Sequence, residues 1–188
     1  MPIRTKPNHP LKFGHSPRRG FTLIELLVAA TILVLLVGGS IAAFFRFQNR
    51  QLVQTTATNI KSLLEVAQTK ARNKEVPKSC LSSTLLLAYY EVYVQGTTVK
   101  VRAVCAEDGK NAQIANTPQA DMPSLALVIP ADVTVNFPDS VGFFPLQGGV
   151  RSSSGNSSII ITVTKAPYTA TFTIEVDGNI SDIVITNT

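Results

Sequence analysis

A long uncharged run near the N-terminus constrains this chain more than any other feature. Residues 26–45 contain no charged side chain, and Arg46 ends the run. At about 1.5 Å per residue, a helix over this run reaches about 30 Å, which is the thickness of the hydrocarbon core of a bilayer. We therefore expect one membrane-spanning helix, which we hypothesise to be an anchor, a targeting signal and an assembly element at once.

The positive charge of the chain lies before this run. The 188 residues include 17 basic and 12 acidic side chains, giving a formal net charge of +5. Residues 1–20 hold five of the basic side chains and no acidic one, so the rest of the chain is neutral overall. Because basic flanks stay on the cytoplasmic side of a membrane, we expect residues 1–20 to be cytoplasmic and the part after the span to face outward.

One carboxylate, Glu25, interrupts the start of the apolar segment. An ionisable residue inside an apolar span is costly and marks a functional position. Two plainer interpretations compete with a functional one: a secretory signal cut after small residues such as 40–42, and an anchor with no further role. Neither gives Glu25 a purpose, and we disfavour both.

Residues 20–29, Gly-Phe-Thr-Leu-Ile-Glu-Leu-Leu-Val-Ala, resemble the signature of type IV prepilins and type II secretion pseudopilins. The resemblance implies that prepilin peptidase cleaves between Gly20 and Phe21, removes residues 1–20 as a leader, and methylates the new amine of Phe21. It also implies that Glu25 meets the Phe21 amine of a neighbouring subunit and so sets the register of assembly.

The composition argues against an enzyme. Both histidines, His9 and His15, lie in the expected leader, so the mature chain has no histidine for acid–base catalysis, for a nucleophilic triad or for zinc. Asp177, Asn179 and Asp182 resemble no complete calcium ligand set and are better explained as a turn with solvated acids. We expect no catalytic residue, cofactor or metal.

Beyond Arg46 apolar residues recur at helical spacing. They are Val53, Ala57, Ile60, Leu64, Ala67 and Ala71. The helix should end near Val76, because Pro77 lacks the N–H that a further turn needs. We therefore predict one helix from Phe21 to Val76. The pair Gly38-Gly39 is either its weakest point or a close helix–helix contact, and both interpretations stay open.

After Cys80 the apolar pattern changes to that of strands. The expected strands are 84–94, 99–105, 125–129, 133–137, 159–164, 169–176 and 180–185, and the first two form a hairpin. Residues 106–124 are polar and contain prolines, which is typical of a long loop. Tyr89, Tyr90 and Tyr93 are interpreted as a half-buried strand face, with a surface platform as the alternative.

These elements predict an α+β fold in which a long N-terminal helix packs on a small, mostly antiparallel β-sheet domain. The resemblance identifies this arrangement as a pilin fold. The expected parts are the leader (1–20), the transmembrane half of the helix (21–45), its amphipathic half (46–76) and an extracytoplasmic β-rich domain (77–188).

Two cysteines, Cys80 and Cys105, lie in the part that is expected to face outward. Disulfides form in oxidising extracytoplasmic compartments, so we favour a bridge between them. In the chain-entropy model a bridge closing this loop stabilises the fold by about 3–4 kcal/mol. Two buried free thiols are the alternative.

A second resemblance covers much of the outward-facing part. Residues 67–80 are similar to the helix end of GspH/FimT-type minor pilins and pseudopilins, and the order of Phe143-x-Pro145-x-x-Gly148 and the later strands is similar to their C-terminal domain. The resemblance implies a structural subunit of a hetero-oligomeric filament, which is a type IV pilus or a type II secretion pseudopilus.

The implied partners are other pilin or pseudopilin subunits, prepilin peptidase, an inner-membrane platform protein and a cytoplasmic assembly ATPase. The subunit would cross the inner (cytoplasmic) membrane once, with its C-terminal domain outside, before it enters the filament.

DNA capture for natural transformation is the alternative function, because some FimT-type minor pilins bind DNA through basic C-terminal residues. Phosphate contacts need clustered basic side chains. After Cys80 the chain has five basic residues against nine acidic ones, and residues 178–188 contain no basic residue. We therefore rank DNA binding second and expect no nucleic-acid partner.

Overall fold

The computed structural model describes residues 20–80, 86–106, 119–138, 140–145, 149–152 and 158–187. All of the predicted leader except Gly20 lies outside them. The chain divides into two compact units, Met1–Ala43 and Phe44–Thr188. The helices are α1 (Leu23–Arg72) and the short 3₁₀ helix η1 (Lys78–Cys80). The strands are β1 (Leu86–Gln95), β2 (Thr98–Ala106), β3 (Gln119–Val128), β4 (Thr134–Asn136), β5 (Ser140–Phe143), β6 (Val150–Ser152), β7 (Ile159–Lys165), β8 (Tyr168–Ile174) and β9 (Val184–Asn187).

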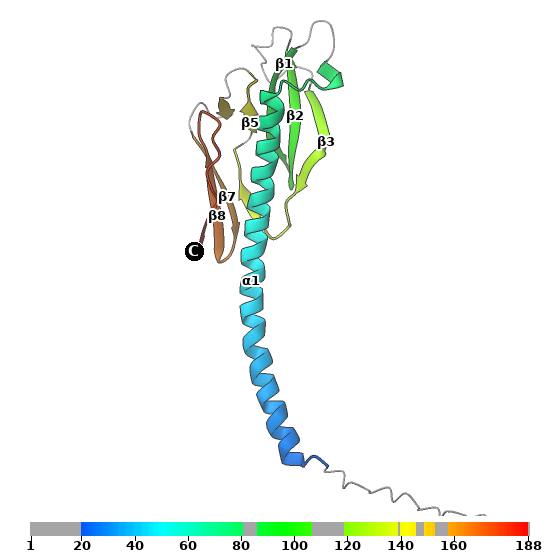
Figure 1. The fold of residues 1–188 in the computed structure, drawn as a ribbon, viewed down its shortest axis with the longest axis vertical. Helices are drawn as coiled ribbons and strands as arrows, with labels where there is room; N and C mark the ends of the chain where they lie inside the picture. The colour runs from blue at the N-terminus through cyan, green and yellow to red at the C-terminus, as the bar shows by residue number, and fades with distance from the viewer. Residues whose placement is uncertain are drawn as a thin grey trace, which may run out of the picture. The chain divides into compact units, whose positions relative to one another are not determined.

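Two antiparallel sheets lie in the second unit (Figure 1). One has five strands in the order β3-β2-β1-β5-β6, and the other has four in the order β4-β7-β8-β9. Each of the strand pairings in the described part of the chain is antiparallel. The predicted α+β class, a long N-terminal helix packed on a small antiparallel β domain, is therefore confirmed.

The hairpin predicted after Cys80 is confirmed in its described part. β1 and β2 pair from Leu86 opposite Ala106 to Gln95 opposite Thr98. Gly96 takes a φ of 61° in the turn between them, a conformation that costs glycine little because it has no Cβ.

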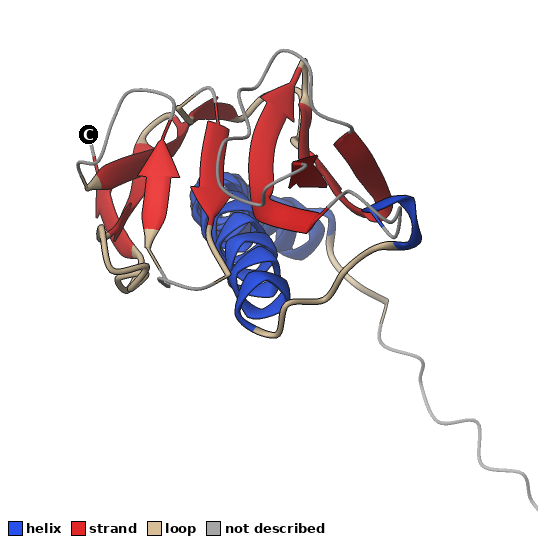
Figure 2. Ribbon diagram, turned by 90° about the horizontal axis from the view of Figure 1, so that it is seen from above, coloured by secondary structure: helices blue, strands red, loops and turns tan. Residues whose placement is uncertain are grey.

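The apolar stripe on the later part of α1 forms the core with both sheets. All six residues of the predicted stripe are buried, and Thr56 and Leu63 are buried beside them. The six stripe residues and Leu63 pack in one cluster with Val92 and Val101 of the first sheet and Phe172 of the second. Seen from above, this part of α1 lies on one side of the strands (Figure 2). Helical periodicity therefore predicted the buried face correctly.

The helix ends at Arg72, four residues before the predicted end at Val76. The N–H of Lys74 bonds the carbonyl of Ala71, and the N–H of Glu75 bonds the carbonyl of Lys70. This is a Schellman motif, in which the residue after the helix adopts a left-handed conformation. Lys74 has the corresponding φ of 50°. Capping by the backbone thus stops the helix before Pro77 does.

The structure differs from the predicted strands at β3, β5 and β6. β3 begins at Gln119, inside the region predicted as a loop, and Pro123 is tolerated because β3 is an edge strand with a register irregularity there. β5 and β6 were not predicted. β5 contains Gly142, a weak strand former, and an added Cβ at this position would lie 3.1 Å from the Tyr89 ring.

The last strand starts at Val184 and not at Ile180. Ile180 makes only a single bridge with Ile174. The N–H of Ser181 donates to the carbonyl of Thr173, and the Ser181 hydroxyl accepts a hydrogen bond from the N–H of Thr173. The hydrogen bonds between Ser181 and Thr173 take the place of regular backbone pairing here, so β9 begins only at Val184.

The cap at Lys74 yields a stability prediction. We expect Lys74→Gly to raise the free energy of unfolding by about 1 kcal/mol, because glycine has no Cβ to clash in the left-handed conformation. Lys74→Ala keeps the Cβ and should remain close to the wild type. Denaturant unfolding of the purified chain in detergent, followed by the near-ultraviolet circular dichroism of its tyrosines, measures both. Equal stability of the two variants would contradict this account of the helix end.

Candidate functional site

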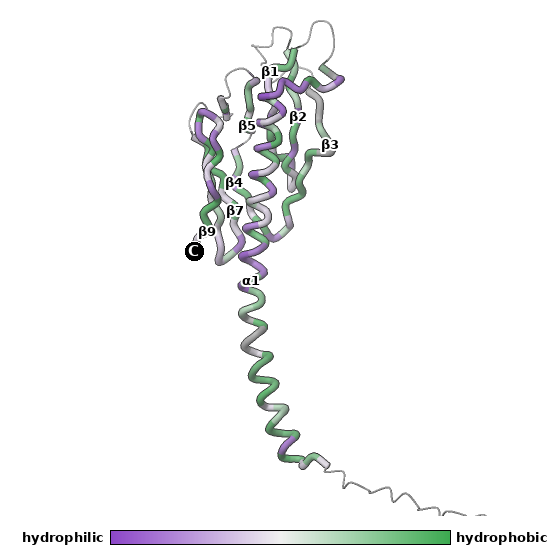
Figure 3. Tube along the Cα trace, viewed as in Figure 1, coloured by the Kyte–Doolittle hydropathy of each residue, from purple (hydrophilic) through white to green (hydrophobic). Residues whose placement is uncertain are grey.

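The first part of α1 has an apolar surface on all sides. Nearly every described large apolar side chain from Phe21 to Val37 is at least half exposed, and Phe21 reaches 83%. Figure 3 shows this part as almost continuously hydrophobic. A helix that is apolar all round requires lipid or other helices around it, since water solvates it poorly. Among the described residues, α1 is the one helix with the length and composition to cross a membrane.

Glu25 lies in the first turn of this helix and is exposed. Its N–H donates to the hydroxyl of Thr22 at 3.3 Å, and the N–H of Leu26 donates to the Thr22 carbonyl at 3.2 Å. Thr22 is therefore the N-cap, and Glu25 is the third helical residue, as in a capping box. Sequence reasoning missed Thr22, although a threonine three residues before a glutamate at the start of an apolar run is a recognised signal.

The fold places no demand for glycine at position 20. A Cβ on Gly20 would meet no atom within 4 Å, and Gly20 is not among the glycines with positive φ. Gly38 in the span is equally open on its own chain. Any requirement for glycine at either position must come from another molecule, such as an enzyme or a neighbouring helix.

Residues 15–41 match the family model described as the prokaryotic N-terminal methylation motif. The match covers 27 of the 188 residues and includes residues 20–29, the segment that resembles the type IV prepilin and pseudopilin signature. Type IV prepilins and pseudopilins, which carry this motif, are structural subunits. They assemble with other pilins, are substrates of prepilin peptidase, and pass from the inner membrane to the pilus. No curated protein and no solved structure matches the chain.

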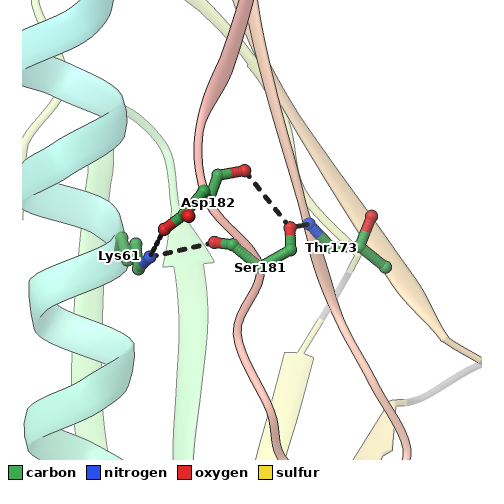
Figure 4. A network of polar contacts seen from close by, with 4 residues as sticks. All are labelled: Lys61, Thr173, Ser181 and Asp182. Atoms are coloured by element: carbon green, nitrogen blue, oxygen red, sulfur yellow. Dashed lines mark hydrogen bonds and ion pairs between the residues drawn. The ribbon is translucent and has the colours of Figure 1, made fainter.

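Polar side chains attach the C-terminal segment to α1 (Figure 4). Lys61 Nζ donates to the Ser181 carbonyl at 2.9 Å and approaches Asp182 Oδ1 at 3.5 Å. About two turns further on, Gln68 Nε2 donates to the Gly178 carbonyl at 2.6 Å. These bonds hold the loop before β9 against the helix.

The acidic side chains of residues 177–182 have partners within the fold. Asp177 Oδ1 accepts the N–H of Asn179 at 2.9 Å, which makes a turn, and Asp182 pairs with Lys61. In the described part of the chain, no group of three or more histidine, cysteine or acidic side chains is placed to hold a metal ion.

The three tyrosines of β1 do not share one surface. Tyr90 is buried, its hydroxyl donates to the Glu75 carbonyl behind the helix end, and burial raises its pKa to about 12. Tyr89 lies in a separate apolar cluster and packs against Phe144, with ring centroids 5.1 Å apart. Burial also raises the pKa of Tyr89. Strand packing therefore explains Tyr89 and Tyr90, while Tyr93 is half-buried and its ring centroid lies 4.3 Å from the Arg102 guanidinium.

Most basic side chains of the β domain are engaged within the chain. Arg102 Nε bonds buried Glu91 at 2.5 Å, Lys100 Nζ bonds Gln95 at 2.7 Å, and Lys165 pairs with Asp132. Arg151 lies near the Phe144 ring, and Lys110 is outside the described residues. These pairings lower the charge available for phosphate contacts, so the geometry adds nothing to the DNA-binding alternative.

Cys80 and Cys105 form a disulfide in the structure, with Cα atoms 5.8 Å apart. Both residues are buried. Cys80 ends η1 and Cys105 lies near the end of β2, so the bridge ties the segment after α1 to an inner strand of the five-stranded sheet.

The bridge can be tested in protein isolated from its native envelope. We expect the mass of the chain to rise by two hydrogen atoms on reduction, because Cys80 and Cys105 are its only cysteines. The double variant Cys80→Ala/Cys105→Ala should lose about 3–4 kcal/mol of unfolding free energy. Reduced wild-type chain is the matched control and should lose a similar amount. Free thiols that alkylate without reduction would rule the bridge out.

Proposed function

We propose that the chain is a minor pilin or pseudopilin of the GspH/FimT type, a structural subunit of a type IV pilus or of a type II secretion pseudopilus. One observation carries the proposal: a single exposed carboxylate, Glu25, starts an apolar helix that also bears the methylation motif. The order of the long helix, the hairpin and the C-terminal strands supports the subtype.

The energetics of Glu25 favour a partner from another subunit. A carboxylate in a membrane span costs up to about 3 kcal/mol at the centre of the bilayer. The partial positive charge at the start of α1 offsets only about 0.3–1 kcal/mol of such a cost. The remaining cost is removed by a cation at the same depth, and the amine of a processed Phe21 is one. On this proposal Glu25 bonds the Phe21 amine of the neighbouring subunit.

The open surroundings of Gly20 support processing at this position. The fold tolerates a side chain there, so a requirement for glycine would lie in the active site of prepilin peptidase. Cleavage before Phe21 exposes the amine that Glu25 needs. Processing and assembly are then two steps of one mechanism, followed by insertion through the platform protein and the assembly ATPase.

Assembly tests the role of Glu25. We expect Glu25→Val to insert into the membrane and to be cleaved, but to be missing from sheared filaments. Glu25→Asp should give an intermediate yield, because the carboxylate is one methylene shorter. Glu65→Val is the matched control, since Glu65 is an exposed glutamate of α1 outside the apolar run, and it should assemble normally. Normal filament yield from Glu25→Val would refute the pairing.

Processing has its own test. Mass spectrometry of the mature chain should show Phe21 as the first residue, carrying one methyl group. Gly20→Glu should leave the full precursor, because the peptidase must accommodate a side chain at the cut. A mature chain that begins at Ile3, or one that begins directly after Ala42, would contradict the assignment.

A further inference from the structure

A cluster of aromatic and basic side chains follows the apolar run on α1. Phe44, Phe45 and Phe47 are 57–59% exposed, and Arg46 and Arg50 are exposed between and after them. The two arginines are four residues apart, so they lie on the same face of the helix. We call residues 44–50 the basic–aromatic collar. Arginine side chains near the end of a membrane span extend to the membrane–water interface.

The height of the collar matches the headgroup layer. Phe45 ends the uncharged run, and Arg46 and Arg50 follow it by about 1.5 Å and about 7.5 Å along the helix axis. The polar layer of one leaflet is about 5–8 Å thick. When the apolar run fills the hydrocarbon core, both guanidinium groups therefore fall within the layer that contains the lipid phosphates.

The domain begins at the same height. Asn49 Nδ2 donates to the carbonyl of Ala166 in the β7–β8 turn at 3.4 Å, only three residues beyond Arg46. The adjacent Lys165 is paired with Asp132, and this hydrogen bond lowers the pKa of the Asp132 carboxyl. The charges of Lys165 and Asp132 beside the β7–β8 turn thus offset each other.

The other basic residues of α1 have different surroundings. Lys61 is bonded to the segment before β9, and Lys70 pairs with Glu75 at 2.7 Å. Arg72 lies about 40 Å beyond Arg46 along the helix. Among the ion pairs between described residues, none includes Arg46 or Arg50.

We propose that Arg46 and Arg50 bind the phosphate groups of anionic phospholipids in the outer leaflet of the membrane. Arginine matches phosphate geometry with paired N–H donors, and the three phenylalanines fill the space between the lipid chains and the headgroups. The bound lipids fix the height of the domain on the membrane before the subunit enters a filament. This binding depends on the membrane span and is independent of the pairing of Glu25.

Lipid selectivity measured beside the collar tests the proposal. The chain has no tryptophan, so Phe47→Trp provides a single fluorophore in the collar. The full-length variant is placed in phosphatidylcholine vesicles that contain spin-labelled phosphatidylglycerol or, separately, spin-labelled phosphatidylcholine. We expect the anionic lipid to quench more strongly, with a preference of up to about fivefold for each arginine, and we expect salt to weaken it. A molar excess of inorganic phosphate should leave the preference in place.

Matched variants locate the effect. In the Phe47→Trp background, Arg46→Gln/Arg50→Gln should abolish the preference, whereas Arg72→Gln/Lys74→Gln removes the same charge at the far end of α1 and should keep it. Equal quenching by the two lipids in the parent variant would overturn the proposal, even where filament assembly is normal. Equal quenching together with an assembly defect of Arg46→Gln/Arg50→Gln would overturn it in favour of an acidic protein neighbour.

Discussion

The first part of α1 is apolar on every side, and most other features of the chain follow from this constraint. Such a surface is not stable in water, so it requires a bilayer and, on the proposed function, neighbouring helices after assembly. The basic residues are distributed accordingly, with five before the apolar run and Arg46 immediately after it. On the proposed function, the same apolar side chains of α1 contact lipid in the membrane and other helices in the filament.

Within this apolar surface, the N-terminus of α1 is the polar exception. Thr22 caps the helix through the N–H of Glu25, and the Glu25 carboxylate lies where the helix dipole favours a negative charge. The cap satisfies backbone groups but leaves the carboxylate exposed. The same residue can therefore begin the helix in one subunit and accept an amine from the next. A local capping signal and an intersubunit role are compatible at one position.

The second part of α1 has the opposite character, because it is attached on one face to two sheets. Small apolar residues such as Ala57, Ala67 and Ala71 let the strands approach closely, and Lys61 and Gln68 add hydrogen bonds to the C-terminal segment. The disulfide adds a covalent link just beyond the helix end. Apolar packing, hydrogen bonds and a disulfide consequently fix the second part of α1 to the sheets. On the proposed function, the β domain would then keep a fixed place on the helix.

The sequence by itself determined the apolar run that is long enough to span a membrane, the buried stripe of α1 and the antiparallel class of the domain, because each depends on spacing along one segment. Tertiary structure decided where α1 ends, since the cap at Lys74 depends on backbone conformation and not on the proline. It decided that β5, which contains Gly142, is a strand, because pairing with β1 compensates for a weak propensity. It also decided which face of β1 meets the helix. Neighbouring side chains of a strand point to opposite faces of the sheet. The register between the strands places Tyr90 in the core and Tyr89 on the other face.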